Sequence, residues 1–177
     1  MDNLNTPDNM SKNTHTKLFK LQFSGAREDD TMNTVKVKKL YDHAKLPRYG
    51  TEFSAGADLC ACLTEPITIL PGETRMISIG IAMELPVGYA GLVYARSGLA
   101  SKRGLAPANK VGVVDCDYRG EFFVPLRNHS TEPQVIEPGD RIAQMIITPY
   151  YTANFVEAEE LSETARDQGG FGSTGVK

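Results

Sequence analysis

The chain has 177 residues, which is enough for one domain with short extensions and for a core that needs no disulfide staples. Apolar residues make up 41% and charged residues 23%, as is typical of a globular protein. The formal net charge of -3 excludes a generally basic surface, so we expect no nucleic-acid partner, although a small anionic ligand needs only local positive charge.

The cysteine pattern and the apolar segments of the sequence indicate where in the cell the protein is expected. Cys60, Cys62 and Cys116 include a C-x-C pair but no C-x-x-C pair, so they indicate neither a disulfide framework nor a zinc site. The N-terminus has no apolar segment of the signal-peptide kind, and no apolar run approaches the ~18 residues of a membrane span. We therefore expect a cytoplasmic protein with reduced thiols and no membrane partner.

The first 33 residues are rich in Asn, Asp, Thr, Ser and Lys and have no periodic apolar pattern. Such a segment cannot bury enough apolar surface to offset the entropy of ordering, so we expect residues 1–33 to form a disordered N-terminal tail. Its composition indicates neither a function for the tail nor the lack of one.

Apolar and polar residues alternate from residue 34 onward, which is the pattern of strands with one buried face. The alternation is clearest at 35–38, 77–85 and 122–127, and turns rich in Pro and Gly separate these stretches. Many short strands with closely spaced turns predict an all-β sandwich or barrel over residues 34–161. One short helix is expected at Ser97–Arg103, with Ser97 as its cap.

The last stretch, residues 162–177, is rich in glycine and also contains Arg166, Phe171, Ser173 and Thr174. Glycines let successive N–H groups turn toward one anion, and the hydroxyls and the guanidinium add donors suited to phosphate. A Gly-rich terminus is most often a floppy tail, but a large aromatic among the glycines favours an arm that orders around a ligand. The string is not a Walker A loop, because no Gly-Lys-Ser/Thr follows.

Two internal segments also combine groups that bind anions or catalyse reactions. Arg96-Ser97-Gly98 offers a cation, a hydroxyl and free N–H groups where a helix begins, although an ordinary capped helix with a surface arginine is the commoner case. The segment 109–120 has valines flanking an Asp-rich turn, which predicts a hairpin with polar groups at its tip. A lone Asp there is usually turn chemistry, whereas two Asp residues and Tyr118 favour a site.

Two shorter segments, A-G-A-D-L with Asp58 and G-D-R-I-A-Q with Gln144, say little by themselves. Together and in order, however, the five segments resemble the five motifs of the trimeric dUTP pyrophosphatases, or dUTPases. The other three strings are R-S-G-L-A, N-x-V-G-V-V-D-x-D-Y-R-G and G-G-F-G-S-T-G, and the match runs from Ser54 to Gly175.

The resemblance implies a distorted jelly-roll or β-clip-like barrel and a homotrimer with exchanged C-terminal arms. Each active site would lie between subunits and be closed by the Gly-rich arm of a neighbouring chain, which excludes bulk water. The implied reaction is hydrolysis of dUTP to dUMP and pyrophosphate, which limits uracil incorporation into DNA and supplies dUMP for dTMP synthesis.

The resemblance also implies roles by position. Asp115 would activate a water for in-line attack on the α-phosphorus, and Tyr118 would pack under the deoxyribose where a 2′-hydroxyl has no space. Asn109 and the backbone of the strand ending at Val114 would read the uracil edge. The groups implied to hold the phosphates and cover the base are Arg96, Ser97, Gly98, Gln144, Arg166, Phe171, Gly172, Ser173 and Thr174.

Mg²⁺ is the implied cofactor, and it would arrive on the triphosphate and keep several of its waters. Asp58 matches the acid of the family that touches those waters. Three positions depart from the family pattern: Asp167 follows the last motif's Arg where Gly is usual, Lys110 stands where Gly is frequent, and Cys116 is a mild variation.

Three alternative functions are compatible with parts of this pattern. A dCTP deaminase shares the fold, but that group typically has Arg-Ser-Ser and lacks the D-x-D-Y-R-G segment. A nucleotide sensor that binds protein partners would be expected to lose Asp115 or Phe171, and both are present. A purely structural jelly roll does not account for five matched motifs.

Overall fold

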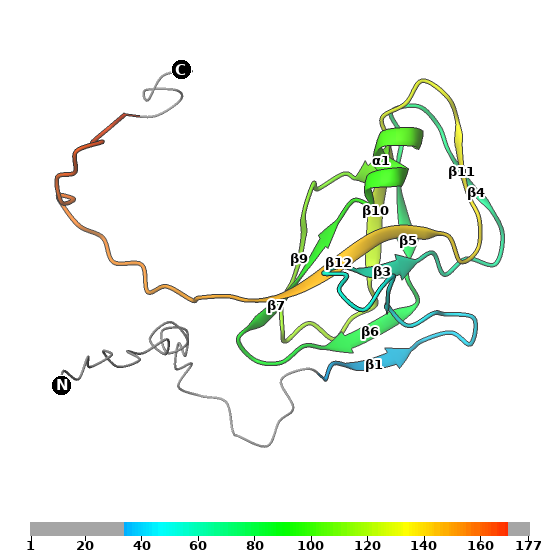
Figure 1. The fold of residues 1–177 in the computed structure, drawn as a ribbon, viewed down its shortest axis with the longest axis horizontal. Helices are drawn as coiled ribbons and strands as arrows, with labels where there is room; N and C mark the ends of the chain where they lie inside the picture. The colour runs from blue at the N-terminus through cyan, green and yellow to red at the C-terminus, as the bar shows by residue number, and fades with distance from the viewer. Residues whose placement is uncertain (1–33, 170–177) are drawn as a thin grey trace, which may run out of the picture.

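The computed structural model describes residues 34–169, so the expected N-terminal tail and Phe171, Gly172, Ser173 and Thr174 lie outside it. The described chain is nearly all β, with one short helix, α1 (Ser97–Arg103) (Figure 1). No helix among these residues is long and apolar enough to cross a membrane. The strands are β1 (Lys36–Lys39), β2 (Arg48–Tyr49), β3 (Ala57–Cys60), β4 (Ile67–Ile69), β5 (Thr74–Ser78), β6 (Ile81–Glu84), β7 (Tyr89–Tyr94), β8 (Leu105–Pro107), β9 (Gly112–Val114), β10 (Phe123–Asn128), β11 (Gln134–Ile136) and β12 (Arg141–Pro149).

The strands form four antiparallel sheets that enclose one core. The largest has the order β2-β3-β12-β7-β9, the next has the order β5-β10-β8, and β1-β6 and β11-β4 are two-stranded. Inward-facing side chains of the two larger sheets, such as Leu59 and Met145 on one and Ile77 and Leu126 on the other, belong to a single buried cluster. The expected all-β, jelly-roll-like fold is confirmed.

The alternation in 122–127 has the predicted consequence. Val124 and Leu126 on β10 are buried, and the alternate residues Phe123, Pro125 and Arg127 are more exposed. Asn128 continues the buried face and is a polar residue there, with its amide Nδ2 donating to the Ile69 carbonyl at 3.0 Å and the Glu132 carbonyl at 2.8 Å. These bonds make the burial of an amide tolerable.

The sequence predicted one strand over 77–85, but the structure has two strands there, β5 and β6. The chain breaks at Gly80, whose φ is +71°, so β5 pairs with β10 while β6 pairs with β1. A Cβ at Gly80 would collide with the thiol of buried Cys62, so only glycine fits this crossing. The periodic pattern hid the break because Ile77, Ile79 and Ile81 all stay buried across it.

Two other local expectations were also wrong. Ser97 does not cap α1: Arg96 is the N-cap, in an extended conformation and without a side-chain capping bond. Segment 109–120 is not a hairpin, because β9 pairs with β7 whereas the next strand, β10, pairs with β5 and β8. The Asp-rich turn therefore connects two different sheets.

The chain leaves the barrel after β12. Residues 150–169 form no helix or strand, and in Figure 1 they run away from the barrel. Large apolar side chains on this segment are almost fully exposed, including Tyr151 at 90%, Phe155 at 93% and Leu161 at 89%. Regular structure thus ends at Pro149, before the expected start of the arm at residue 162.

The three cysteines are free thiols. Burial raises the pKa of the Cys60 and Cys62 thiols, which keeps both in the neutral form at physiological pH.

Candidate functional site

Two hollows contain the internal site residues that the sequence predicted, and they share no lining residue. We call the first, of about 740 Å³, the arginine hollow. We call the second, of about 310 Å³, the aspartate hollow. The arginine hollow is lined by Gly50, Ser54, Ala55, Gly56, Asp58, Tyr94, Arg96, Ser97, Gly98, Leu99, Lys102, Arg103, Arg141, Gln144 and Ile146. The aspartate hollow includes Asn109, Gly112, Val113, Val114, Asp115, Tyr118, Glu121 and Phe122.

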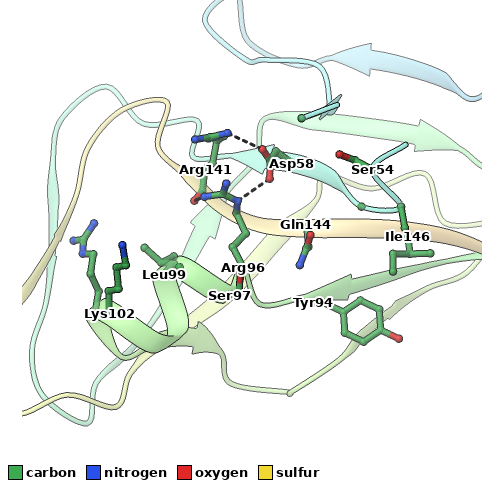
Figure 2. A pocket seen from close by; sticks show the side chains of 15 residues that line it. Ser54, Asp58, Tyr94, Arg96, Ser97, Leu99, Lys102, Arg141, Gln144 and Ile146 are labelled. Carbon is green, nitrogen blue, oxygen red and sulfur yellow. Dashed lines mark hydrogen bonds and ion pairs between the residues drawn. The ribbon is translucent and has the colours of Figure 1, made fainter. Parts of the chain in front are cut away.

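The arginine hollow lies on the outer face of the five-stranded sheet. Asp58 on β3, Gln144 on β12 and Tyr94 on β7 are direct cross-strand partners, so their side chains share one face. The alternate residues Leu59 and Val93 are buried in the core. Alternation along three strands therefore brings together residues that are far apart in sequence, as Figure 2 shows.

An ion triad forms the centre of this hollow. The Arg96 Nε donates to Asp58 Oδ1 at 2.7 Å, and the Arg141 Nη1 donates to Asp58 Oδ2 at 3.1 Å (Figure 2). The Arg96 Nη1 also donates to the Arg141 carbonyl at 3.4 Å. The Asp58 side chain is only 13% exposed, so this carboxylate is mostly enclosed between the two guanidiniums.

Gln144 is held in a fixed position beside the triad. Its Nε2 donates to the Ala95 carbonyl at 2.9 Å. A Cβ at Gly56 would lie 2.6 Å from the Gln144 Oε1, so glycine is needed for the amide to lie where it does. The second N–H of the amide is then available to an acceptor in the hollow.

The charge of the arginine hollow suits an anion. Four cations, Arg96, Lys102, Arg103 and Arg141, line it with a single carboxylate, Asp58. Arg103 is committed elsewhere, since its Nε donates to the Gln134 Oε1 at 3.0 Å, whereas no described residue accepts a bond from the Lys102 ammonium. Ser97 and Gly98 are exposed at the same wall, where α1 begins.

Sequence reasoning missed Arg141 and Lys102. Arg141 stands in the G-D-R-I-A-Q string, in which the sequence pointed to Gln144 alone, and Lys102 lies two residues after the end of R-S-G-L-A. Neither position has a local signal, because each becomes part of a site only when the sheet and helix are placed together.

The aspartate hollow is formed by β9 and the turn that follows it. The Asn109 amide lies over Gly112, where a Cβ would approach its Nδ2 to 3.3 Å. Asp115 is exposed, and its carboxylate has no hydrogen-bond partner among residues 34–169. The Tyr118 ring is 46% exposed, and its hydroxyl donates to the Glu121 carbonyl at 2.9 Å. An unpaired carboxylate beside an exposed aromatic face is suited to bind and react rather than to stabilise the fold.

The two departures from the family's glycines occur at left-handed backbone positions. Lys110 has a φ of +65° and Asp167 a φ of +42°, and they are the only non-glycine residues with positive φ in residues 34–169. Glycine adopts this region without a steric penalty, which explains why glycine is usual at both positions.

Arg166 is not in either hollow. Its Nε donates to the Gly169 carbonyl at 2.8 Å within an exposed turn of the C-terminal segment. The start of that segment, in contrast, contacts the Asp115 turn, because the Tyr150 hydroxyl lies 3.6 Å from the Cys116 Sγ. The hydrogen bond with Cys116 raises the pKa of Tyr150, and nearby acidic groups add to the effect.

Comparisons with known proteins show which family the chain resembles in sequence and in fold. A sequence profile of the dUTPase family matches residues 42–175. A deoxyuridine 5'-triphosphate nucleotidohydrolase of Desulfitobacterium hafniense is 53% identical over 150 residues, covering 82% of this chain and 99% of the relative.

Two solved structures are similar to this fold. A dUTPase of Staphylococcus bacteriophage 80alpha, solved with dUpNHpp, has a TM-score of 0.71 and 28% identity, covering 81% of this chain and 99% of that one. A dUTPase from phage phi11 of S. aureus, whose structure concerns coordination of a structural Mg(II) ion, has a TM-score of 0.65 and 27% identity, covering 72% and 98%. The chain described here belongs to the dUTPase family.

Proposed function

We propose that this protein hydrolyses dUTP to dUMP and pyrophosphate. The observation that carries the proposal is the pair of hollows, one with four cations and one with the unpaired Asp115 carboxylate. The four cations of the arginine hollow suit the binding of a polyanion. The free carboxylate of the aspartate hollow suits a reaction that needs a general base. The family match and the names of the relatives support dUTP hydrolysis as the reaction. Removing dUTP would limit uracil incorporation into DNA and supply dUMP.

The active form in this proposal is a homotrimer in which the arginine hollow of one copy meets the aspartate hollow of another. Three features support a partner at the aspartate hollow. Asp115 is exposed, Val113 is an apolar residue that is 65% exposed, and Tyr118 presents part of its ring to solvent. A second copy would bury this apolar surface and enclose the reacting groups in a drier site.

The nucleoside would bind in the aspartate hollow. The Asn109 amide and the backbone of Gly112–Val114 would pair with the uracil edge, and a cytosine would leave buried polar groups unmatched there. The Tyr118 ring would lie under the deoxyribose and leave no space for a 2′-hydroxyl. The phosphates would be held by Arg96, Ser97, Gly98 and Gln144 in the arginine hollow.

Asp115 would act as the general base. It would accept a proton from a water, and that water's oxygen would form a bond to the α-phosphorus from the side opposite the leaving group. The bond from the α-phosphorus to the bridging oxygen would break, and pyrophosphate would leave with that oxygen. The exposed, unpaired state of the carboxylate supports this role, because no cation among residues 34–169 forms an ion pair with it.

Mg²⁺ fits this site as a partner of the substrate rather than as an ion held by the protein alone. Residues 34–169 contain no group of three or more His, Cys, Asp or Glu side chains that could hold a metal. Asp58 is the one carboxylate that lines the arginine hollow, and it would contact waters around the ion. When bound, Mg²⁺ would supply charge neutralisation on the phosphates.

The C-terminal arm would close the assembled site. Residues 150–161 have exposed apolar side chains, which supports the proposal that this segment packs against another copy of the chain. Arg166, Ser173 and Thr174 would then grip the terminal phosphate, Gly172 would allow a close backbone approach, and Phe171 would stack on the uracil.

The decisive experiment measures pyrophosphate release with Mg²⁺ from dUTP, dCTP, dTTP and UTP in parallel. Fast release from dUTP alone is expected. If the protein binds dUTP but releases no pyrophosphate from it, the proposed hydrolase activity is wrong and the protein is a nucleotide sensor. Ammonia release from dCTP would instead identify a deaminase.

A further inference from the structure

We propose that Arg141 is a further substrate-binding residue, which contacts the outer two phosphates of the nucleotide. The inference rests on the proposed function and deepens it at the arginine hollow. It begins from a difference between the two arginines that share Asp58.

Arg96 is the more enclosed of the two and uses more of its donors internally. Its side chain is 26% exposed, its Nε bonds Asp58, and its Nη1 bonds the Arg141 carbonyl. Arg141 is 57% exposed and gives only its Nη1 to a described residue, the Asp58 carboxylate. Its Nε and Nη2 donors are therefore free to bind an anion.

The backbone places Arg141 at the edge of this hollow. Arg141 is the first residue of β12 and pairs with Cys60, and a bulge between Arg141 and Ala143 interrupts the regular register with β3. A bulge changes the direction of the side chain beside it. Here the result is that Arg141 reaches the carboxylate of Asp58, two residues before its pairing partner Cys60 (Figure 2).

Asp58 positions both arginines. Each of its oxygens accepts from a different guanidinium, so the two forks are fixed relative to each other before a ligand arrives. The pair carries more positive charge than one carboxylate neutralises, and the excess lies in a hollow that Lys102 also lines. Because Arg96 lies deeper and Arg141 nearer to solvent, we assign the inner phosphate to Arg96 and the outer phosphates to Arg141.

A purely structural role predicts a different result. If the ion pair only tied β12 to β3, loss of Arg141 would lower the melting temperature and would change the affinity of every ligand by the same factor. A phosphate contact instead predicts a loss that grows with the number of phosphates on the ligand.

The test is calorimetric titration of the full-length protein with dUMP and with dUpNHpp in the presence of Mg²⁺. For Arg141→Gln we expect the Kd of dUpNHpp to rise about tenfold, as one charge-assisted contact is lost. The Kd of dUMP should change less than about twofold. Arg141→Lys should lie between, because the ammonium keeps the charge but not the fork.

Arg75→Gln is the matched control. Arg75 also donates to a carboxylate, that of Glu73 at 3.2 Å, and is 50% exposed, but it is on β5 and lines neither hollow. It should leave both dissociation constants unchanged.

Unchanged dUpNHpp affinity in Arg141→Gln would overturn the inference, as would equal losses for dUMP and dUpNHpp. If Arg141→Gln does not fold, Arg141→Lys decides: several-fold weaker dUpNHpp binding supports the inference and wild-type binding overturns it. A wild-type protein that neither binds dUpNHpp nor cleaves dUTP would instead overturn the proposed function itself.

Discussion

In the arginine hollow, Asp58, Arg96 and Arg141 hold one another, whereas in the aspartate hollow the Asp115 carboxylate has no partner among residues 34–169. The first hollow thus has its charges fixed within a single chain. The second keeps its reactive group exposed beside apolar Val113, which is 65% exposed. Under the proposed function, each chain alone would hold the phosphate-binding groups in place, and a second copy would complete the reactive half of the site.

The largest test of this contrast is Asp115→Asn. The amide keeps the shape of the side chain but cannot accept a proton, so we expect the turnover number for dUTP to fall by about 10²–10⁴. Binding of dUpNHpp should stay within about threefold of wild type, because the arginine hollow is intact. Pyrophosphate release and calorimetry measure the two effects.

Asp42→Asn serves as the control, because it makes the same chemical change at an exposed loop position outside both hollows. Near-normal turnover in Asp115→Asn would show that Asp115 is not the general base. The proposed functional difference between the two hollows would then also be wrong.

A smaller loss is expected when residues 166–177 are deleted. The two hollows would still meet in a trimer, but nothing would close over the nucleotide, and we expect turnover to fall roughly tenfold to a hundredfold. Light scattering should report an unchanged trimer, while pyrophosphate release reports the loss. A truncated protein that turns over dUTP at the wild-type rate would show that the assembled hollows need no closing arm.

Gly56→Ala perturbs the arginine hollow alone. The new Cβ would lie 2.6 Å from the Gln144 Oε1 and 3.3 Å from its Cβ, so the amide must move away from the Ala95 carbonyl. Loss of one hydrogen bond predicts an increase in KM for dUTP of about fivefold, with kcat little changed.

Gly50→Ala is the control in the same hollow, because its Cβ would meet only the Ser54 Oγ at an ordinary 3.7 Å. Should kcat fall instead of KM rising, Gln144 would act in the chemical step and the division between the hollows would need revision.

The sequence was sufficient for features that depend on local pattern and insufficient for those that depend on packing. Alternation at 35–38 and 122–127 predicted β1 and β10 because one face of each strand is more buried than the other. The break at Gly80 could not be predicted, since buried isoleucines continue through it. The hairpin prediction at 109–120 failed because the partners of β9 and β10 are strands distant in sequence.

The same division applies to the candidate site. Motif resemblance predicted Asp58, Arg96 and Gln144. The paired strands β3 and β12 bring Asp58 and Gln144 together, and Arg96 reaches the same hollow from the start of α1, just after β7. Arg141 was overlooked because its place in the hollow depends on a bulge, which leaves no periodic signal in the sequence.

The smallest expected effect concerns the backbone that leads into the aspartate hollow. Lys110 adopts a φ of +65°, which costs a non-glycine residue about 1–2 kcal/mol, while no non-glycine residue lining the arginine hollow has positive φ. Lys110→Gly removes that cost but adds entropy to the unfolded chain, about 0.5–1 kcal/mol. The two effects together predict a rise in the free energy of unfolding of about 0–1.5 kcal/mol, measured by urea denaturation.

Lys38→Gly, on the exposed edge of β1, should instead lower the free energy of unfolding. The backbone of Lys38 is extended, so there is no steric penalty for glycine to remove. If Lys110→Gly destabilises the protein as much as Lys38→Gly, the turn is not strained. The Lys110 side chain then contributes more to the aspartate hollow than its exposed position indicates, and the contrast between a fixed and an open hollow would extend to this residue.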